Sequence, residues 1–569
     1  MTTKHTLLCQ AGLGVLATLC LAGAADAKPK HHHPAAAKSA SQASAMQQQL
    51  ADMKAQIATL QSRQDSQAQA HDQDAQQIAG LSQQLADSQA KTQALAAQAQ
   101  EQIQTIPSAV KSEIAAEQPK DGNIHYKGVT LTLGGFAAAE SVYRSKNEEA
   151  DIGSSFAKIP FANAPLAHTD ELRGTARQSR LSLLAEGDIS PDTHAAFYTE
   201  LDFLAGPQTG NSNESNSFSP RIRNVYGTLD MGNLEFLAGQ NWSLTTMNTK
   251  GITPRNELPP ATIDAQYVVG FVWARQPQLR ITDNFWDKQI WAAVSVENPQ
   301  TTLASAATGT TGLSVSGLTV TTGGASASQF DSANTLSLNH APDVVGKLAF
   351  EPDFGGSRPI HAEVYGIYRS YFDRVNVTGA NLLGLPVGAS NKNSDGGGIG
   401  GGVTWTVVPK LLDLQVSGLT GRGVGRYGSG QLPDAVVGVD GALRPIQESM
   451  YMVGGTLHAT PALDLYAYYG DEQDKAVATT IGGNHYGYGN PFATLAGCSV
   501  EGATCSPDLK EETQITGGLW DKVYQGSFGQ VRIGLQYSYT ELTAFSGATG
   551  GAPKTNDSMI FTSFRYYPF

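Results

Sequence analysis

The sequence is poor in three things that long chains usually have: cysteine, charge and extended apolar runs. Only 4 of its 569 residues are cysteine, charged residues make up 16%, and the formal net charge is −13. This balance argues against a nucleic-acid partner, because binding a phosphate backbone needs clustered basic surface. Beyond the first 27 residues no apolar run approaches the roughly 18 residues of a membrane-spanning helix, so we expect none.

The one long apolar run stands at the start of the chain. Lys4 is followed by TLLCQAGLGVLATLCLAG, and Ala25-Asp26-Ala27 has the small-x-small form of a cleavage site. We interpret residues 1–27 as a secretory signal peptide. The next segment, residues 28–40 (KPKHHHPAAAKSA), is interpreted as a flexible basic and histidine-rich spacer.

Removal of that peptide would leave two cysteines, Cys498 and Cys505. Two cysteines seven residues apart in an exported chain favour one disulfide that closes a small loop. A metal-binding pair is the alternative, but no partner ligands accompany it. No cofactor motif, metal cluster or catalytic set is recognisable elsewhere, so neither a cofactor nor enzymatic activity is expected.

Residues 41–106 are rich in Gln and Ala and almost free of Gly, Pro and aromatics. Their apolar residues keep one alternating four-three spacing, which is the heptad pattern of a coiled coil; they are Met46, Leu50, Met53, Ile57, Leu60, Ile78, Leu81, Leu85, Leu95, Ala99 and Ile106. Several positions in the middle of this series are polar, so the core is weak. The pattern does not choose between two and three strands, and residues 107–128 are interpreted as a linker.

From Val129 to Phe569 the apolar pattern changes to a period of two. About sixteen segments of roughly 10 to 15 residues recur with turn signals between them, and the sixth of these predicted strands is VVGFVWARQPQLRI, residues 268–281. Short connections such as 190–192, 408–410 and 526–530 alternate with long ones rich in Gly, Ser, Thr and Asn. The sequence therefore predicts an all-β transmembrane antiparallel barrel of about 16 strands, preceded by an α-helical coiled coil. Such a barrel belongs in a Gram-negative outer membrane, in contact with its lipid, with the coil in the periplasm.

The chain ends in SFRYYPF, residues 563–569. If SMIFTSFRYYPF is the closing strand, Phe569 is expected at the barrel rim, hydrogen-bonded to the first strand, because a barrel in lipid cannot leave an open edge. Tyr566, Tyr567 and Phe569 would join the aromatic girdle. Every second residue before Phe569 would share its outward face, but this series includes Arg565 and Ser563, which are not apolar. The sequence therefore leaves open which residues of this strand face outwards. In the preceding strand Val531, Ile533, Leu535, Tyr537 and Tyr539 are expected to face lipid.

The order of signal peptide, Gln/Ala-rich coil and sixteen-stranded barrel resembles the DcaP-like porins, and RQSRLSLLAEGD (177–188) and ARQPQLRI (274–281) are the local segments that carry the likeness. The C-terminus also resembles the aromatic signature by which outer-membrane barrels are recognised by the barrel assembly machinery. The resemblance implies a homotrimeric passive channel associated with dicarboxylates and other small organic anions.

The connection after the fifth predicted strand, residues 243–266, is the candidate constriction loop. It carries Lys250, Arg255, Glu257 and Asp264. In general porins the loop at this position folds into the barrel and narrows it. The alternative is that it covers the barrel from outside.

Basic residues concentrate on three early strands of the predicted barrel. They are Arg177 and Arg180, Arg221 and Arg223, and Arg275 and Arg280, with Arg369 further along. Arg180 and Arg280 alternate with apolar residues and should face inwards, because a charge on the lipid face costs about 2–4 kcal/mol. Arg223 and Arg275 share a phase with apolar neighbours, which places them at the rim or at a bulge. Inward guanidinium groups would attract small anionic solutes, or would only neutralise Glu186, Glu200, Glu297 and Glu363.

Two further functions compete with a porin for small anions. A barrel filled by its loops would be structural, tethering the outer membrane to peptidoglycan through the coiled coil. An outer-membrane lipase would need a catalytic set that the sequence does not show.

Overall fold

The computed structural model describes residues 123–205, 217–304, 317–323 and 336–569, except 356, 382 and 482. Gly80, Gln83, Asp87, Ala90 and Lys91 are also described, all as helical. The chain divides into two units, Met1–Glu117 and Gln118–Phe569. The predicted signal peptide, the spacer, nearly all of the predicted coiled coil and residues 107–122 of the predicted linker lie outside the described residues, so these remain predictions.

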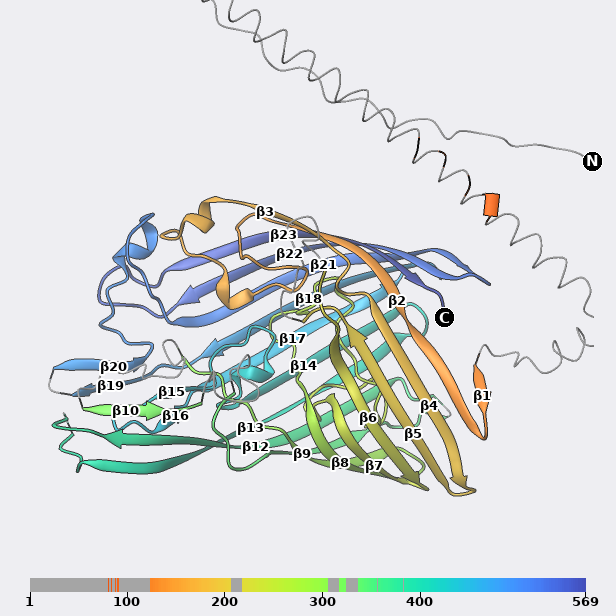
Figure 1. The fold of residues 1–569 in the computed structure, drawn as a ribbon, viewed down its shortest axis with the longest axis horizontal. Helices are drawn as coiled ribbons and strands as arrows, with labels where there is room; N and C mark the ends of the chain where they lie inside the picture. The colour runs from red at the N-terminus through yellow and green to blue at the C-terminus, as the bar shows by residue number, and fades with distance from the viewer. Residues whose placement is uncertain are drawn as a thin grey trace, which may run out of the picture. The chain divides into compact units, whose positions relative to one another are not determined.

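The second unit is built from strands and a few 3-10 turns (Figure 1). The strands are β1 (Ile124–Tyr126), β2 (Val129–Arg144), β3 (Glu171–Thr175), β4 (Arg180–Ser190), β5 (Thr193–Asp202), β6 (Arg221–Met231), β7 (Leu234–Trp242), β8 (Arg275–Phe285), β9 (Ile290–Glu297), β10 (Leu318–Thr321), β11 (Asp343–Phe350), β12 (Ile360–Val377), β13 (Gly388–Val408), β14 (Leu412–Arg422), β15 (Ala435–Val437), β16 (Leu443–Pro445), β17 (Gln447–His458), β18 (Leu463–Asp474), β19 (Val477–Ile481), β20 (Asn484–Tyr488), β21 (Leu509–Gly526), β22 (Gly529–Ala544) and β23 (Lys554–Tyr567). The 3-10 turns are η1 (Phe156–Lys158), η2 (Pro165–His168), η4 (Gly425–Tyr427) and η5 (Ala496–Ser499).

The main sheet closes on itself. Neighbours in the chain pair antiparallel, and the last strand, β23, pairs with β2, with Met559 opposite Arg144. Strands β3 and β4 both pair with β2, so together they count as one strand of the barrel. Strands β10 and β11 likewise both pair with β12 and count as one. The prediction of a sixteen-stranded antiparallel barrel is therefore confirmed. In the described part of the chain, closure leaves the main sheet without an open edge, as a barrel in lipid requires.

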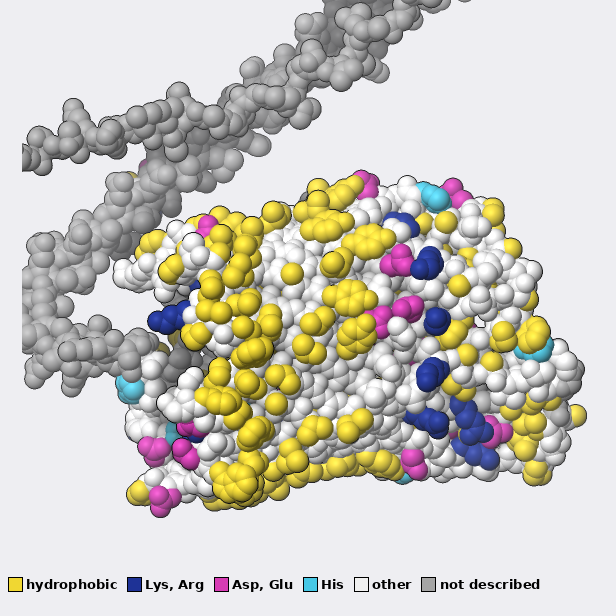
Figure 2. Space-filling model, turned by 180° about the vertical axis from the view of Figure 1, so that it is seen from behind, with side chains coloured by type: hydrophobic (Ala, Val, Ile, Leu, Met, Phe, Trp, Pro, Cys, Tyr) yellow, Lys and Arg dark blue, Asp and Glu magenta, His cyan; other side chains and the backbone are white. Residues whose placement is uncertain are grey.

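Alternation along the strands separates an apolar outer face from a polar inner one. In β22, Ile533, Leu535 and Tyr537 are about half exposed, whereas Gln536 and Ser538 are buried. The predicted outward phase of this strand is thus confirmed for its central residues. Apolar side chains cover much of the outer wall in Figure 2. A wall that is apolar outside and polar inside suits contact with lipid.

Tight turns and long loops alternate along the barrel, as predicted. A tight turn joins β13 to β14, where Lys410 has a positive φ of 64°. Two of the long connections, 243–274 between β7 and β8 and 423–446 between β14 and β17, contain many buried residues. Because of the alternation, the long loops gather at one end of the barrel (Figure 1).

The sixth predicted strand begins later than the sequence indicated. The expected strand covered residues 268–281, but β8 starts at Arg275. Val268 and Phe271 are completely buried inside the barrel. Gly270 has a φ of 84° and breaks the extended run, and its amide donates to Glu472 Oε1 at 2.7 Å. An apolar run that looked like a lipid-facing strand therefore packs inwards.

The C-terminal prediction is correct for the strand and wrong for its last residue. Pairing of β23 with β2 ends at Tyr566, and Phe569 lies beyond the strand with 65% of its surface exposed. Pro568 has no amide hydrogen to continue the ladder. Ser563 is buried on the inner face and Phe564 is exposed, so the outward phase runs through the even-numbered residues rather than back from Phe569.

The start of the barrel lies within the predicted linker. Strand β1 pairs with β2, with Ile124 opposite Leu131, across a turn at Lys127 and Gly128. None of the helices in the described part of the chain is long and apolar enough to cross a membrane.

Candidate functional site

The loop between β7 and β8 lies inside the barrel. The Asn248 amide donates to Glu363 Oε1 on β12 (3.1 Å), and the Ile263 amide donates to Gln536 Oε1 on β22 (2.5 Å). Strands β12 and β22 stand far apart in the ring, so the loop crosses the interior between them. These contacts do not fit the alternative that the loop covers the barrel from outside. Whether the loop forms the narrowest point for a solute stays a prediction.

A buried charged network holds one part of this loop against the wall. Lys347 Nζ lies 2.8 Å from Glu363 Oε2 and donates to the Thr246 carbonyl oxygen at 2.8 Å. His361 lies 2.8 Å from Glu363 Oε1 and 2.6 Å from Glu351 Oε1. Sequence reasoning missed Lys347 and His361 as partners of Glu363. The available signal was the alternation in DVVGKLAF, where the lysine takes the face opposite Leu348.

Two of the four charged residues predicted for the loop are exposed. They are Lys250 and Arg255, and Arg255 Nη1 donates to the Tyr226 hydroxyl at 3.3 Å. Glu257 accepts a hydrogen bond from Asn241 Nδ2 at 3.4 Å. Burial raises the pKa of the Glu257 carboxyl, since the carboxylate loses hydration inside the barrel.

Asp264, the last of the four charged residues predicted for the loop, is buried and hydrogen-bonded to backbone amides. It is 1% exposed, and its Oδ1 accepts hydrogen bonds from the amides of Ser154 (3.1 Å) and Gln266 (2.8 Å). Ser154 belongs to the connection that follows β2. The carboxyl therefore joins two inward connections.

Four of the predicted arginines gather against two carboxylates of β5. Arg223 Nε lies 2.6 Å from Glu200 Oε1, and Arg223 Nη1 lies 2.8 Å from Asp202 Oδ2. Arg221 pairs with Asp202 at 2.8 Å, and Arg180 approaches Glu200 only to 3.7 Å. The neutralising role that the sequence left open therefore applies to Glu200.

A bulge turns Arg223 inwards. The pairing of β5 with β6 shifts register between Glu200 and Leu201, which face Asn224 and Ile222. Arg223 is left without an opposite residue, as in a β-bulge. This agrees with one of the two placements that the apolar phase of its neighbours predicted.

Arg275, the fourth guanidinium group of the cluster, makes no ion pair with any carboxylate of the described residues. It stands at the first position of β8, with its guanidinium carbon 5.0 Å from the Trp242 ring centre and 5.1 Å from that of Trp273. Its Nη1 is buried without a hydrogen-bond partner. Contact with two indole faces supports a cation there through cation–π attraction. Four guanidinium groups thus face only two carboxylates.

Tyr267 closes this cluster from the inward loop. It has a φ of 72°, unusual for a residue with a side chain, and its ring packs 6.1 Å from Trp242 and 5.3 Å from Trp273. Burial disfavours the phenolate, but the guanidinium groups of Arg223 and its neighbours outweigh burial and lower the pKa of Tyr267. The hydroxyl therefore faces a net positive environment.

Alkaline pH should reduce any preference of the barrel for anions, because the Tyr267 phenolate would then add a negative charge to the cluster. The change is expected below the ordinary tyrosine pKa of about 10. Zero-current potentials recorded from about pH 7 to 10 measure it, and Tyr267→Phe should flatten the profile. An equal slope in the variant would show that another group is responsible.

The remaining predicted arginines lie apart from the cluster. Arg280 is buried on β8 and donates to Gln278 Oε1 (3.0 Å) and to the Trp242 carbonyl oxygen (2.6 Å). Arg177 pairs with Asp151 at 2.8 Å. Neither Arg280 nor Arg177 contacts the carboxylates of β5.

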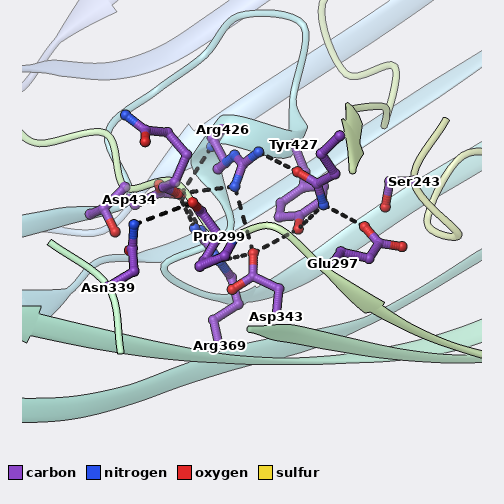
Figure 3. A network of polar contacts seen from close by, with 12 residues as sticks. Ser243, Glu297, Pro299, Asn339, Asp343, Arg369, Arg426, Tyr427 and Asp434 are labelled. Atoms are coloured by element: carbon purple, nitrogen blue, oxygen red, sulfur yellow. Dashed lines mark hydrogen bonds and ion pairs between the residues drawn. The ribbon is translucent and has the colours of Figure 1, made fainter. Parts of the chain in front are cut away.

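Arg369 belongs to a second network, around the loop 423–446. It pairs with Asp343 (3.1 Å) and Asp434 (2.7 Å). The Tyr427 hydroxyl donates to Asp343 at 2.9 Å, and the Arg426 side chain lies alongside (Figure 3). Sequence reasoning did not foresee that this loop also folds inwards, because its Gly-rich composition is that of an ordinary surface loop.

The wall across the ring from the arginine cluster is acidic. Glu448 on β17 faces Asp474 on β18, and Glu472 on β18 faces Glu512 on β21. All four are 3% exposed or less. Neither oxygen of Glu448 or Glu512 has a hydrogen-bond partner in the described part of the chain. The barrel interior therefore has a basic side and an acidic side.

Glycines let the second inward loop approach these carboxylates. The Gly430 amide donates to Glu472 Oε1 at 2.8 Å. A Cβ atom at Gly430 would lie 2.3 Å from Glu512 Oε2 and would collide with it. A side chain at this position would require the Glu512 and Glu472 carboxylates, or the loop itself, to shift.

Cys498 and Cys505 form the predicted disulfide, with their Cα atoms 4.8 Å apart. It lies in the long connection before β21. No group of three or more His, Cys, Asp or Glu side chains in the described ranges is arranged to hold a metal ion.

No protein-family model and no curated protein matches this sequence. Among solved structures, the outer membrane channel DcaP of Acinetobacter baumannii aligns with a TM-score of 0.52 at 18% identity, over 78% of this chain and 99% of that chain. An anion-selective porin from Comamonas acidovorans aligns with a TM-score of 0.43 at 13% identity, over 77% and 99% of the two chains. This protein therefore shares the barrel fold of the DcaP channel, as the sequence resemblance predicted.

Proposed function

We propose that this protein is an outer-membrane porin for the passive diffusion of small hydrophilic solutes, and that it favours small organic anions such as dicarboxylates. The observation that carries the proposal is the excess of guanidinium groups at Arg180, Arg221, Arg223 and Arg275 over the carboxylates beside them. Fixed cations along an aqueous path select anions. Guanidinium groups also offer two parallel hydrogen bonds to a carboxylate.

Arg275 supplies the free binding capacity in this mechanism. The Arg221 and Arg223 side chains are already engaged by Asp202 and Glu200, whereas Arg275 lies against two indole faces and forms no ion pair with a carboxylate of the described residues. A passing carboxylate would find an unpaired guanidinium group there without breaking an existing ion pair. Selection would rest on size and fixed charge, with no energy coupling. The outer-membrane location, the homotrimer and the periplasmic coil form part of the same proposal.

A structural barrel is the second candidate, because two loops occupy the interior. Residues 243–274 and 423–446 both contribute fully buried side chains, such as Val268, Phe271 and Tyr427. If these loops seal the barrel, the protein would serve as an anchor and not as a channel.

The zero-current potential of the purified full-length protein in a planar bilayer under a KCl gradient separates these functions. An anion-selective potential, with three equal closure steps, is the expected result. A cation-selective potential would keep the porin but show that the acidic wall of β17, β18 and β21 controls permeation. A silent bilayer would contradict the porin and favour the structural barrel.

A further inference from the structure

We infer that the outer face of the long strands carries a binding surface for a phosphorylated glycolipid of the outer leaflet. This inference rests on the proposed membrane location. It concerns five basic residues, here called the basic strip: Arg374 on β12, Arg422 on β14, Lys475 directly after β18, Lys510 on β21 and Lys554 on β23. All five are exposed. In Figure 2 basic side chains line up on the outer wall, beyond the apolar surface.

The phase of the strands places four of the five residues on the outer wall and not in the interior. Lys510 stands at a register shift of β21, between Leu509 and Glu511, and is exposed. Arg374 is separated by an even number of positions from the exposed Val364 and Tyr368 on β12, so it lies on the same face of the strand. Arg422 has the same parity as Leu414 and Val416 on β14, which are also exposed. These cations therefore stand in line with lipid-facing side chains of the same strands.

The centre of the strip is continuous across neighbouring strands. Arg422 lies opposite Gln447 in the pairing of β14 with β17, and the Lys475 amide donates to the Gln447 carbonyl oxygen at 2.8 Å. Two strand spacings therefore separate Arg422 from Lys475, which is about 10 Å. A single head group with more than one phosphate can contact both cations.

Three cations of the strip are available to a ligand. Arg422, Lys475 and Lys510 make no ion pair with any carboxylate in the part of the chain that the structure describes. The outer carboxylates nearby have other partners, since Glu541 pairs with Lys554 at 2.7 Å and Glu511 accepts from Gln473 Nε2 at 2.9 Å.

An amphiphile fits this surface better than a free anion. Exposed apolar side chains stand on the same strands on the turn side of the cations, with Val416 49% exposed on β14, Tyr469 38% on β18 and Ile515 57% on β21. Acyl chains can lie against this apolar wall while phosphates reach the basic residues above it. A free phosphate would contact only the basic residues and not the apolar side chains.

Native mass spectrometry tests the inference by measuring how tightly the full-length protein in detergent binds diphosphorylated lipid A. The triple variant Arg422→Gln, Lys475→Gln and Lys510→Gln should weaken binding at least tenfold and up to about 100-fold, because each basic residue near an anionic lipid surface contributes about 1 kcal/mol. Dephosphorylated lipid A should bind the wild type as weakly as diphosphorylated lipid A binds the triple variant.

A matched control removes three exposed lysines at the tight turns, through Lys127→Gln, Lys288→Gln and Lys410→Gln. It should keep wild-type lipid affinity. Equal losses in both triple variants, or no loss in the first, would overturn the inference. Inorganic pyrophosphate binding as tightly as lipid A would also overturn it, because the site would then be a simple anion site. Conductance is read separately, so a silent channel leaves this test intact.

Discussion

Replacing Arg275 with glutamine is expected to lower the anion-to-cation permeability ratio about two- to fivefold. The Arg275 guanidinium group has no carboxylate partner in the described residues, so its removal deletes a positive charge without leaving a buried negative one. A single charge beside an aqueous path contributes on the order of 0.5–1 kcal/mol to the passage of an ion, which corresponds to this range. The zero-current potential under a KCl gradient measures the ratio directly.

The matched control for this substitution is Arg374→Gln, which removes the same charge from the outer wall. Its permeability ratio should equal that of the wild type, because Arg374 points away from the interior. An unchanged ratio in the Arg275 variant would place the ion path away from Trp242 and Trp273. Such a result would contradict the assigned role of Arg275 without contradicting the porin.

Replacing Lys347 with methionine is expected to destabilise the barrel by about 3 kcal/mol, because Glu363 loses its ammonium partner and keeps only His361 and the Asn248 amide beside it. The two side chains are 2.8 Å apart and almost completely buried. Loss of the Lys347 bond to the Thr246 carbonyl should also loosen the inward loop, so single-channel current should become noisier. Urea unfolding in detergent and single-channel recordings provide the two measurements.

The double variant Lys347→Met with Glu363→Gln separates charge from packing. It should recover most of the lost stability, since no unpaired charge remains in the wall. The current noise should persist, because the loop still lacks its lysine anchor. If the double variant is as unstable as the single one, shape and not charge balance accounts for the loss. Lys127→Met, at an exposed turn, should leave both measurements unchanged.

The barrel could be predicted because its signals are local. Each strand alternates apolar and polar residues, as Ile533, Leu535 and Tyr537 do against Gln536 and Ser538. The regular change between tight turns and long connections then implies a closed ring, since no strand edge can face lipid. Local reasoning of the same kind predicts that Arg180 and Arg280 face inwards. It also predicts the disulfide between two cysteines seven residues apart.

The contents of the barrel depend on contacts that the strand pattern does not encode. Val268 and Phe271 look like part of a lipid-facing strand, yet Gly270 and the carboxylate of Glu472 hold them inside. The loop 423–446 has the composition of a surface loop but packs against an acidic wall.

The strands, their order and the side of the wall on which most charges lie follow from the sequence alone, because alternation and turn chemistry act over a few residues. Which arginines are neutralised depends on the folded barrel. Arg223 meets Glu200 across a bulge, whereas Arg275 contacts the indole rings of Trp242 on β7 and of Trp273 in the inward loop. These distances depend on strand register and on the course of a long loop, and both are set by packing between residues distant in the chain.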